Sequence, residues 1–148
     1  MKITEALLAE HQVFHSLFDY VEQTLPKLKT LAEIKVLGAM LASALKAHSD
    51  SEDELLIAPL EHCIEQLGQA ETFHDEHEEI DRMLGQVQST TQVSSARKLL
   101  LSAVLSSRRH FDKEERLVFP LAEKTLSQHS LAKLGESWAA RRREVVRI

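Results

Sequence analysis

The segment His110-Phe111-Asp112-Lys113-Glu114 decides the fold, because its His-xxx-Glu spacing also occurs earlier, in His48-Ser49-Asp50-Ser51-Glu52. The His and the Glu of the later motif both follow their counterparts by 62 positions (110 − 48 and 114 − 52). Residues i and i+4 lie on one face of an α-helix. Each motif can therefore direct a nitrogen and a carboxylate toward one point. We interpret the two motifs as halves of a dinuclear metal site inside a helix bundle.

Four long helices are predicted by apolar residues that recur every three or four positions on either side of the motifs. The expected helices span about 4–25, 30 to a break at residue 59, 69–88 and 94–117. Thr4 is expected to cap the first helix, and Thr30 followed by Glu33 is a capping-box signature for the second. Three prolines are expected to end helices, because proline cannot donate a hydrogen bond within a helix: Pro26, Pro59 and Pro120.

A shorter helix is expected near the C-terminus, at about residues 127–143. One of its faces carries Leu131, Leu134 and Trp138, and we expect this face to pack across the bundle. The run Arg141-Arg142-Arg143 suits the end of this helix, where cations offset the helix dipole.

A second internal correspondence relates Glu10-His11 to Glu76-His77. Two helix pairs of similar design make an antiparallel up-down-up-down four-helix bundle the simplest fold. With only three Pro and four Gly in 148 residues, the expected class is all-α. We expect a single domain over residues 1–148, formed by a four-helix bundle at about 4–122 and the short C-terminal fifth helix.

Composition excludes several function classes. The net charge of −5 gives no general attraction to nucleic acid or to a membrane surface. One cysteine cannot form an internal disulfide and fits a reducing compartment. The N-terminus lacks the apolar stretch of a signal peptide, and no apolar run approaches the roughly 20 residues of a membrane span. We therefore expect a cytoplasmic protein with neither a nucleic-acid nor a membrane partner.

Histidines and glutamates continue the inward-facing stripes of the predicted helices as if they were apolar. A buried carboxylate costs several kcal/mol without a counter-charge, and two that face one interior repel each other. No Lys or Arg interrupts these stripes, whereas divalent cations held by imidazoles and bridged by carboxylates would balance the charge. This donor chemistry favours iron, ahead of manganese and zinc. The six residues that define the predicted site are His11, His48, Glu52, His77, His110 and Glu114.

Two further histidines are candidate metal ligands. His15 follows His11 by four residues and His74 precedes His77 by three, so each can share its neighbour's helix face. Either could instead donate a hydrogen bond to a ligand or lie at the rim of the site. Residues expected to face solvent are Asp53, Glu54, Glu115, His62 and His129.

Taken together, these residues resemble the hemerythrin-like (HHE cation-binding) domain family. The resemblance covers about residues 4–122 and is carried by Glu10-His11, His48-xxx-Glu52, His77, His110-xxx-Glu114-Glu115 and Val118-Phe119-Pro120. It implies a four-helix bundle that holds a non-haem di-iron centre, with two Fe ions bridged by Glu52 and Glu114. It also implies that a small diatomic ligand such as O₂ would bind at an open ferrous position.

The expected function is therefore that of a di-iron protein that binds or senses O₂, NO or redox state, or that handles iron. If both glutamates and a solvent oxygen bridge the irons, four histidines leave each iron one open position. Adding both His15 and His74 closes both positions. One alternative is an enzyme that turns over peroxide or NO or repairs iron–sulfur clusters, although a binding role is preferred. Another is a metal-free interaction module that forms a homodimer through the Trp138 segment.

Overall fold

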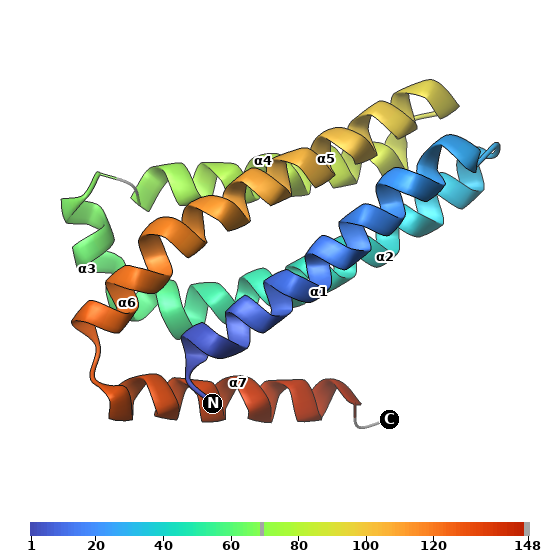
Figure 1. Ribbon diagram of the computed structural model, residues 1–148. Coiled ribbons are helices and arrows are strands. Elements are labelled where there is room, and N and C mark those ends of the chain that lie inside the picture. Colours follow the sequence, from blue (N-terminus) through green and yellow to red (C-terminus); the bar gives the residue numbers. More distant parts are fainter. Residues whose placement is uncertain (69, 147–148) are drawn as a thin grey trace.

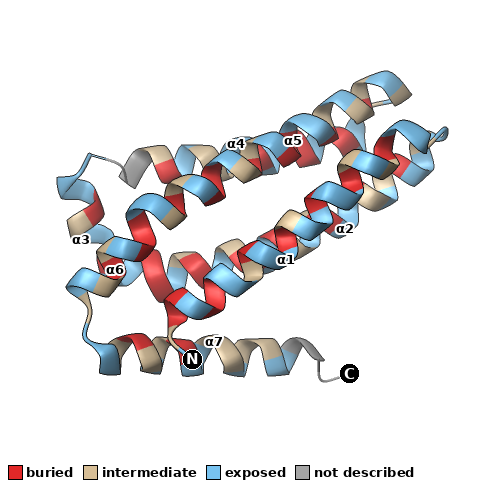
Figure 2. Cartoon of the chain, in the orientation of Figure 1, coloured by how far each residue is buried: buried red, intermediate tan, exposed pale blue. Residues whose placement is uncertain are grey.

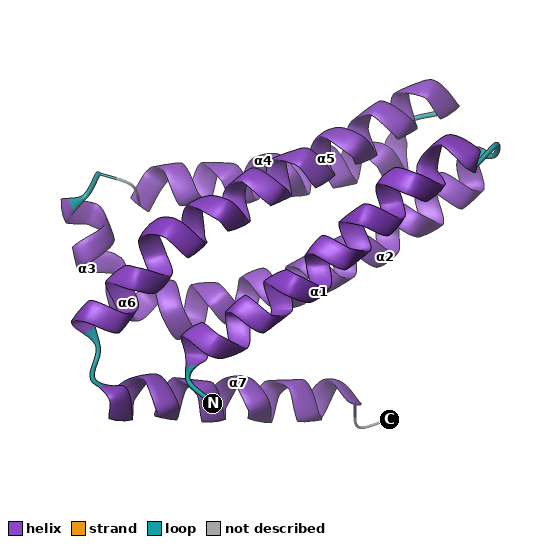
Figure 3. Ribbon diagram, in the orientation of Figure 1, coloured by secondary structure: helices purple, strands orange, loops and turns teal. Residues whose placement is uncertain are grey.

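The computed structural model describes residues 1–68 and 70–146, with side chains described for 1–68 and 72–144. Over these residues the chain is almost entirely helical and has no strand (Figure 3). Four long helices form the bundle: α1 (Ile3–Thr24), α2 (Leu31–Glu52), α4 (Ala70–Ser89) and α5 (Val93–Lys113). Helices α1 and α2 form one antiparallel pair, and α4 and α5 form the other (Figure 1). The predicted all-α, up-down-up-down bundle is thus confirmed.

The ends of these helices follow the sequence signals in most places. Pro26 lies in a 3₁₀ turn, Leu25–Lys27, that ends α1. The capping box is present, because the Glu33 N–H donates to Thr30 Oγ1 (3.2 Å) and the Thr30 N–H donates to Glu33 Oε1 (3.3 Å). The predicted start of the third helix at Gln69 lies outside the described residues.

The prediction that Thr4 caps the first helix is wrong. Helix α1 begins at Ile3, and Lys2 occupies the capping position. The Thr4 hydroxyl instead donates to Glu123 Oε1 at 2.6 Å, a contact with a residue far along the chain. Local sequence could not predict this partner.

The prediction that Pro59 and Pro120 end helices is also wrong. Helix α2 continues through a π-helical turn, Asp53–Ile57, into α3 (Ala58–Gln66). Helix α5 continues likewise through Glu114–Val118 into α6 (Phe119–Thr125). In each case the first residue of the next α-helix donates its N–H to the carbonyl five residues earlier. Each proline then lies in the first turn of that helix, where its missing N–H is not needed.

Helix α7 (Gln128–Val146) runs below the bundle in Figure 1 and contacts α1 and the π-helical turn 53–57. Leu131 is fully buried, and Leu134 and Trp138 pack against the same apolar cluster, as their shared face predicted. Gly135 marks the closest approach, because a Cβ there would lie 1.9 Å from the carbonyl oxygen of Met1. Any larger residue at this position would push α7 away from α1.

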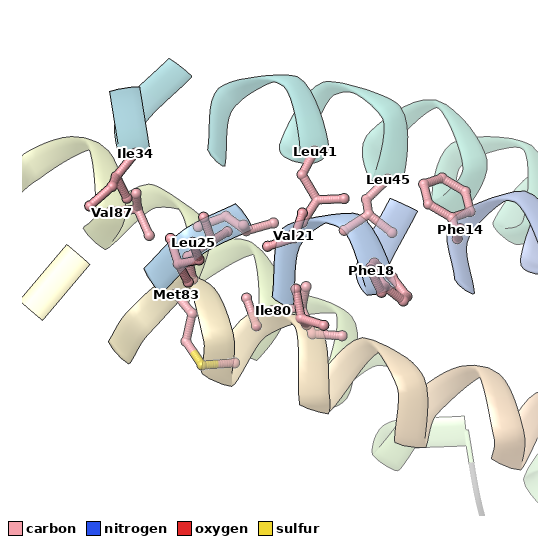
Figure 4. Close-up of a cluster of buried hydrophobic side chains, with 14 of the residues drawn as sticks. Phe14, Phe18, Val21, Leu25, Ile34, Leu41, Leu45, Ile80, Met83 and Val87 are labelled. Atoms are coloured by element: carbon pink, nitrogen blue, oxygen red, sulfur yellow. The ribbon is translucent and has the colours of Figure 1, made fainter. Parts of the chain in front are cut away.

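The interior consists of two apolar clusters separated by a polar layer, and the buried residues face inward on all four long helices (Figure 2). The first cluster, which includes Phe14, Phe18, Leu45 and Ile80, fills the bundle toward the two short loops (Figure 4). The second lies where α3, α6 and α7 close the other end, and includes Leu7, Leu56, Phe73 and Phe119. Along α1, His11 lies between Leu7 of one cluster and Phe14 of the other. Among the described residues, no helix combines the length and apolarity required to cross a bilayer.

The Gly135→Ala substitution should destabilise the protein by about 1–3 kcal/mol, because the added methyl group overpacks the contact between α7 and Met1. Gly85→Ala in α4 is the matched control, since nothing lies within 4 Å of the position that its methyl group would occupy. That change should stabilise the protein by up to about 1 kcal/mol through helix propensity. Urea unfolding followed by circular dichroism measures both values, and equal effects of the two changes would contradict the close packing of α7.

Candidate metal centre

Six side chains, five from the four long helices and Glu114 from the π-helical turn after α5, converge in the polar layer. Their ligand atoms form two groups, in each of which all atoms lie within 4.8 Å of one another. One group comprises His11, His48, Glu52 and Glu114, and the other comprises Glu52, His77, His110 and Glu114. Both glutamates therefore belong to both groups. The sequence predicted this set of six, and the structure brings all six together.

The two shared glutamates are completely buried, and their positions suit bridging ligands. Glu52 Oε2 lies 3.2 Å from His48 Nε2, whereas Glu52 Oε1 lies 3.7 Å from His77 Nε2. Glu114 Oε1 lies 3.3 Å from His110 Nε2 and 3.7 Å from His11 Nε2. Each carboxylate thus reaches toward imidazoles of both groups.

The four carboxylate oxygens of Glu52 and Glu114 have no hydrogen-bond partner among the residues that the structure describes. Buried polar atoms are nearly always satisfied, so four orphaned oxygens in one place require an explanation. Cations accept lone pairs from such oxygens without needing a hydrogen-bond donor. The two carboxylates therefore fit a pair of metal ions.

A second set of carboxylates lies behind the four imidazoles. Glu10 Oε1 lies 3.2 Å from His48 Nδ1, and Glu76 Oε2 lies 2.6 Å from His110 Nδ1. Glu115 Oε2 lies 3.4 Å from His11 Nδ1, and Asp53 Oδ1 lies 3.6 Å from His77 Nδ1. Every ring thus has a carboxylate on its Nδ1 side, the arrangement that orients metal-binding histidines in other proteins.

These outer contacts make the inner nitrogens suitable metal ligands. A neutral imidazole carries one proton, and a carboxylate acceptor holds that proton on Nδ1, which leaves a lone pair on Nε2. The Nε2 atoms of His11 and His48 are 3.2 Å apart, and those of His77 and His110 are 2.7 Å apart. Two lone pairs at such distances repel each other unless a cation or a proton lies between the groups. The imidazole pairs therefore fit the same two cations as the carboxylates.

Two basic side chains stabilise the outer carboxylates. Arg142 of α7 forms a bidentate pair with Glu10, at 2.7 Å from Nε and 2.9 Å from Nη2. Lys113 of α5 donates to Glu76 Oε1 at 2.7 Å. Burial alone would raise the pKa of Glu10, but its contacts with His48 and Arg142 lower that pKa to about 2. The contacts of Glu76 with His110 and Lys113 likewise outweigh burial and lower its pKa.

The buried carboxyl and imidazole groups shift one another's pKa values. Burial and the negative charge of Glu52 raise the pKa of Glu114 well above its ordinary value. Glu114 therefore holds its proton more readily than Glu52 does. Burial also opposes ionisation of Glu52, but contacts with the protonated Glu114, His11 and His48 lower the pKa of Glu52 well below the usual range. Burial would lower the pKa of His48, yet Glu10 and Glu52 raise it to about 9. Burial and the neighbouring His77 lower the pKa of His110 to about 4.

Phenylalanine rings pack against three of the four imidazoles, those of His11, His48 and His110. Phe111 stacks on His11 with ring centroids 3.9 Å apart and planes 5° apart. Phe14 meets His48 edge-on, and Phe73 meets His110 in the same way. In a less polar environment the attraction between a cation and its ligands is stronger.

The structure places His15 and His74 away from both groups. His15 is half-buried, and its Nδ1 lies 3.0 Å from Nη1 of Arg108. Arg108 also pairs with Asp19 and Glu22, so His15 belongs to a polar cluster between α1 and α5. His74 is exposed to solvent. The geometry thus supplies four histidines, rather than five or six, to the two groups.

Several contacts of the centre escaped the sequence analysis. Asp53 and Glu115 were expected to face solvent, but both are half-buried and approach imidazoles. Each directly follows a shared glutamate in the sequence, which was the available signal, and each lies within a π-helical turn, 53–57 or 114–118. Glu54, His62 and His129 are exposed, as expected. Arg142 was expected only to offset a helix dipole, and nothing in the local sequence indicated its contact with Glu10.

Clefts reach the outer edge of the centre on two sides. A cleft of about 430 Å³ lies between α4 and α5 and is lined by Glu76, His110 and Lys113. A smaller cleft of about 210 Å³ lies between α1 and α2 and is lined by Glu10, His48 and Arg142. Each cleft thus meets one ligand-group imidazole and its outer carboxylate from the solvent side.

Fold and site together define a helical bundle with a buried carboxylate–imidazole centre suited to cations. The family model described as the hemerythrin HHE cation-binding domain matches residues 2–122. The chain therefore belongs to this family. The matched range includes all six converging residues, whereas α7 lies outside it. Neither the comparison with curated proteins nor the comparison with solved structures finds a match.

The Glu76→Gln substitution should weaken binding of a divalent cation by about 10- to 100-fold, because the amide supports the His110 ring less well than the carboxylate does. Glu78→Gln, at an exposed position of the same helix, is the matched control and should change the affinity by less than about twofold. Competition with a chromophoric chelator measures both affinities. Equal affinities for the two variants would show that the carboxylate behind His110 has no role in cation binding.

Proposed function

We propose that this chain is a non-haem di-iron protein of hemerythrin type that binds or senses a small diatomic ligand, O₂ or NO. The observation that carries the proposal is the sharing of Glu52 and Glu114 between two four-residue ligand groups. A single cation would be bound by only one of the two imidazole pairs. The Nε2 lone pairs of the other two imidazoles would still face each other. Two cations use every donor in the polar layer.

The donor set supports iron as the resident metal. Each cation would receive two imidazole nitrogens and an oxygen from each glutamate, a mixed set that suits iron. Thiolates, which favour zinc and copper, are absent from both groups of described residues. Manganese accepts a similar set and is the nearest competitor. Four donors would also complete a tetrahedral zinc site, so the metal content of the purified protein distinguishes zinc from iron.

The position of His15 and His74 supports small-ligand binding. With both outside the ligand groups, the protein offers each cation four donor atoms, fewer than the six that octahedral iron accepts. The remaining positions are available to solvent or to a small ligand. The cleft beside His110 ends at that buried ring, and the two apolar clusters around the polar layer favour an uncharged diatomic molecule over a larger polar substrate.

A pair of ferrous ions can supply two electrons to a bound oxidant, and the surrounding residues determine whether turnover follows. The rings packed on His11 and His48 are aromatic and provide no proton donor or acceptor: Phe14, Phe111 and Phe119. These contacts favour reversible binding over an enzymatic reaction with peroxide or NO. A metal-free interaction module is disfavoured by the four orphaned carboxylate oxygens. A cytoplasmic location belongs to the proposal, since a reducing compartment maintains ferrous iron.

Anaerobic loading with ferrous iron should give two ions per chain, and exposure to O₂ or NO should change the optical spectrum. Glu52→Ala should reduce the content to one ion or fewer, because it removes an oxygen from both groups. The exposed His129→Ala is the control and should retain the wild-type content. Inductively coupled plasma spectrometry measures the iron. Less than one ion per wild-type chain would overturn the di-iron proposal, and an unchanged spectrum of loaded protein would overturn the ligand-binding role.

A further inference from the structure

Helix α7 lies outside the part of the chain that matches the family, yet it contacts the metal centre. Arg142 forms its bidentate pair with Glu10, and Glu10 accepts from Nδ1 of His48. The path from α7 to a ligand ring thus contains one intermediate side chain. Arg142 also lies 5.7 Å from the centre of the Trp138 ring and donates weakly to the Ala47 carbonyl at 3.4 Å.

The two halves of the centre differ in how their outer carboxylates are held. Glu76 is held by Lys113, which belongs to α5 and lies three residues after His110. The bundle therefore supplies this cation itself. Glu10 is held by Arg142, which reaches it from a helix added after the bundle. Undocking of α7 would remove the cation that holds Glu10 and leave Lys113 beside Glu76.

The docking of α7 is well defined. Leu131 is fully buried, Trp138 packs against the same cluster, and Gly135 permits backbone contact with Met1. These contacts fix the helix along its length, so that Arg142 reaches Glu10 near the end of the described part of α7. Fixed placement favours a bidentate Arg–carboxylate pair, because both side chains otherwise lose conformational entropy.

We propose that α7 is a functional part of the metal centre and that Arg142 is a positioning residue for the His11/His48 half. The inference rests on the proposed two-cation site. Arg142 holds Glu10 in place, Glu10 keeps the His48 proton on Nδ1, and the Nε2 lone pair stays directed at the cation. Linkage then requires the reverse effect: a cation in this half strengthens the docking of α7.

Arg142→Met should weaken one of the two cation-binding steps by about 10-fold, the low end of the effect seen for residues that support metal ligands. Arg141→Met is the matched control, because Arg141 is adjacent on α7 but pairs with the exposed Glu54. It should leave both steps unchanged. Arg142→Lys keeps the charge but not the bidentate geometry and should give an intermediate loss. Anaerobic calorimetry with ferrous iron resolves the two steps, and circular dichroism confirms that each variant is folded.

A double-mutant cycle separates positioning from a general effect on stability. If Arg142 acts through Glu10, Arg142→Met should cause no further loss of affinity in a Glu10→Gln background. Independent, additive losses would overturn the proposed path. Gly135→Ala tests the same path without removing the arginine, since it displaces α7 and thereby moves Arg142 away from Glu10, and it should weaken the same step as Arg142→Met.

The emission of Trp138, the only tryptophan in the sequence, gives a readout that does not depend on iron chemistry. Zinc titration should shift this emission in the wild-type chain, and Arg142→Met should abolish the shift because the link to the centre is lost. A wild-type chain that binds no cation would contradict the proposed function itself. A wild-type chain that binds two cations, together with an Arg142→Met variant of equal affinity, would overturn only the role of α7.

Discussion

The burial of two carboxylates without hydrogen-bond partners is the constraint on which the rest of the structure depends. Glu52 and Glu114 lie between two apolar clusters, where an uncompensated charge costs several kcal/mol. Four imidazoles lie beside them, and the shared placement of the two acids divides the polar layer into two halves with two imidazoles each. The polar layer therefore suits positive charge between the two acids, and it draws imidazoles from all four long helices.

The outer carboxylates form a closed ring around the bundle. Glu10 of α1 supports His48 of α2, and Asp53, just after α2, approaches His77 of α4. Glu76 of α4 supports His110 of α5, and Glu115, just after α5, returns to His11 of α1. Each helix thus positions an imidazole of the next one, and none of the four imidazoles is supported from its own helix. A displacement of any one helix would consequently disturb two imidazoles, which couples the packing of the bundle to the geometry of the polar layer.

Helical register alone predicted the fold and the six converging residues, because spacing along one helix determines which side chains share a face. The remaining features depend on neighbours that spacing does not specify. His15 shares a helix with His11 but contacts Arg108. Ion pairs with Asp19 and Glu22 hold that arginine between α1 and α5. Asp53 and Glu115 approach the imidazoles of neighbouring helices. The residue pattern of a single helix does not show which residues of another helix it will contact. Arg142 reaches Glu10 across more than a hundred residues of sequence.

The π-helical turns have a consequence for the evolution of this chain by insertion and deletion. Each turn holds one residue more than an α-helical turn and directly follows or begins at a shared glutamate. Loss of a single residue from 53–57 would restore regular α-helix with little rotation of α3, because a five-residue π-helical turn and a four-residue α-helical turn complete nearly the same rotation. The buried face of this turn would then lose one of its three consecutive apolar side chains, Leu55, Leu56 and Ile57. Chain length can therefore change by one residue at these turns while the helix that follows keeps its orientation.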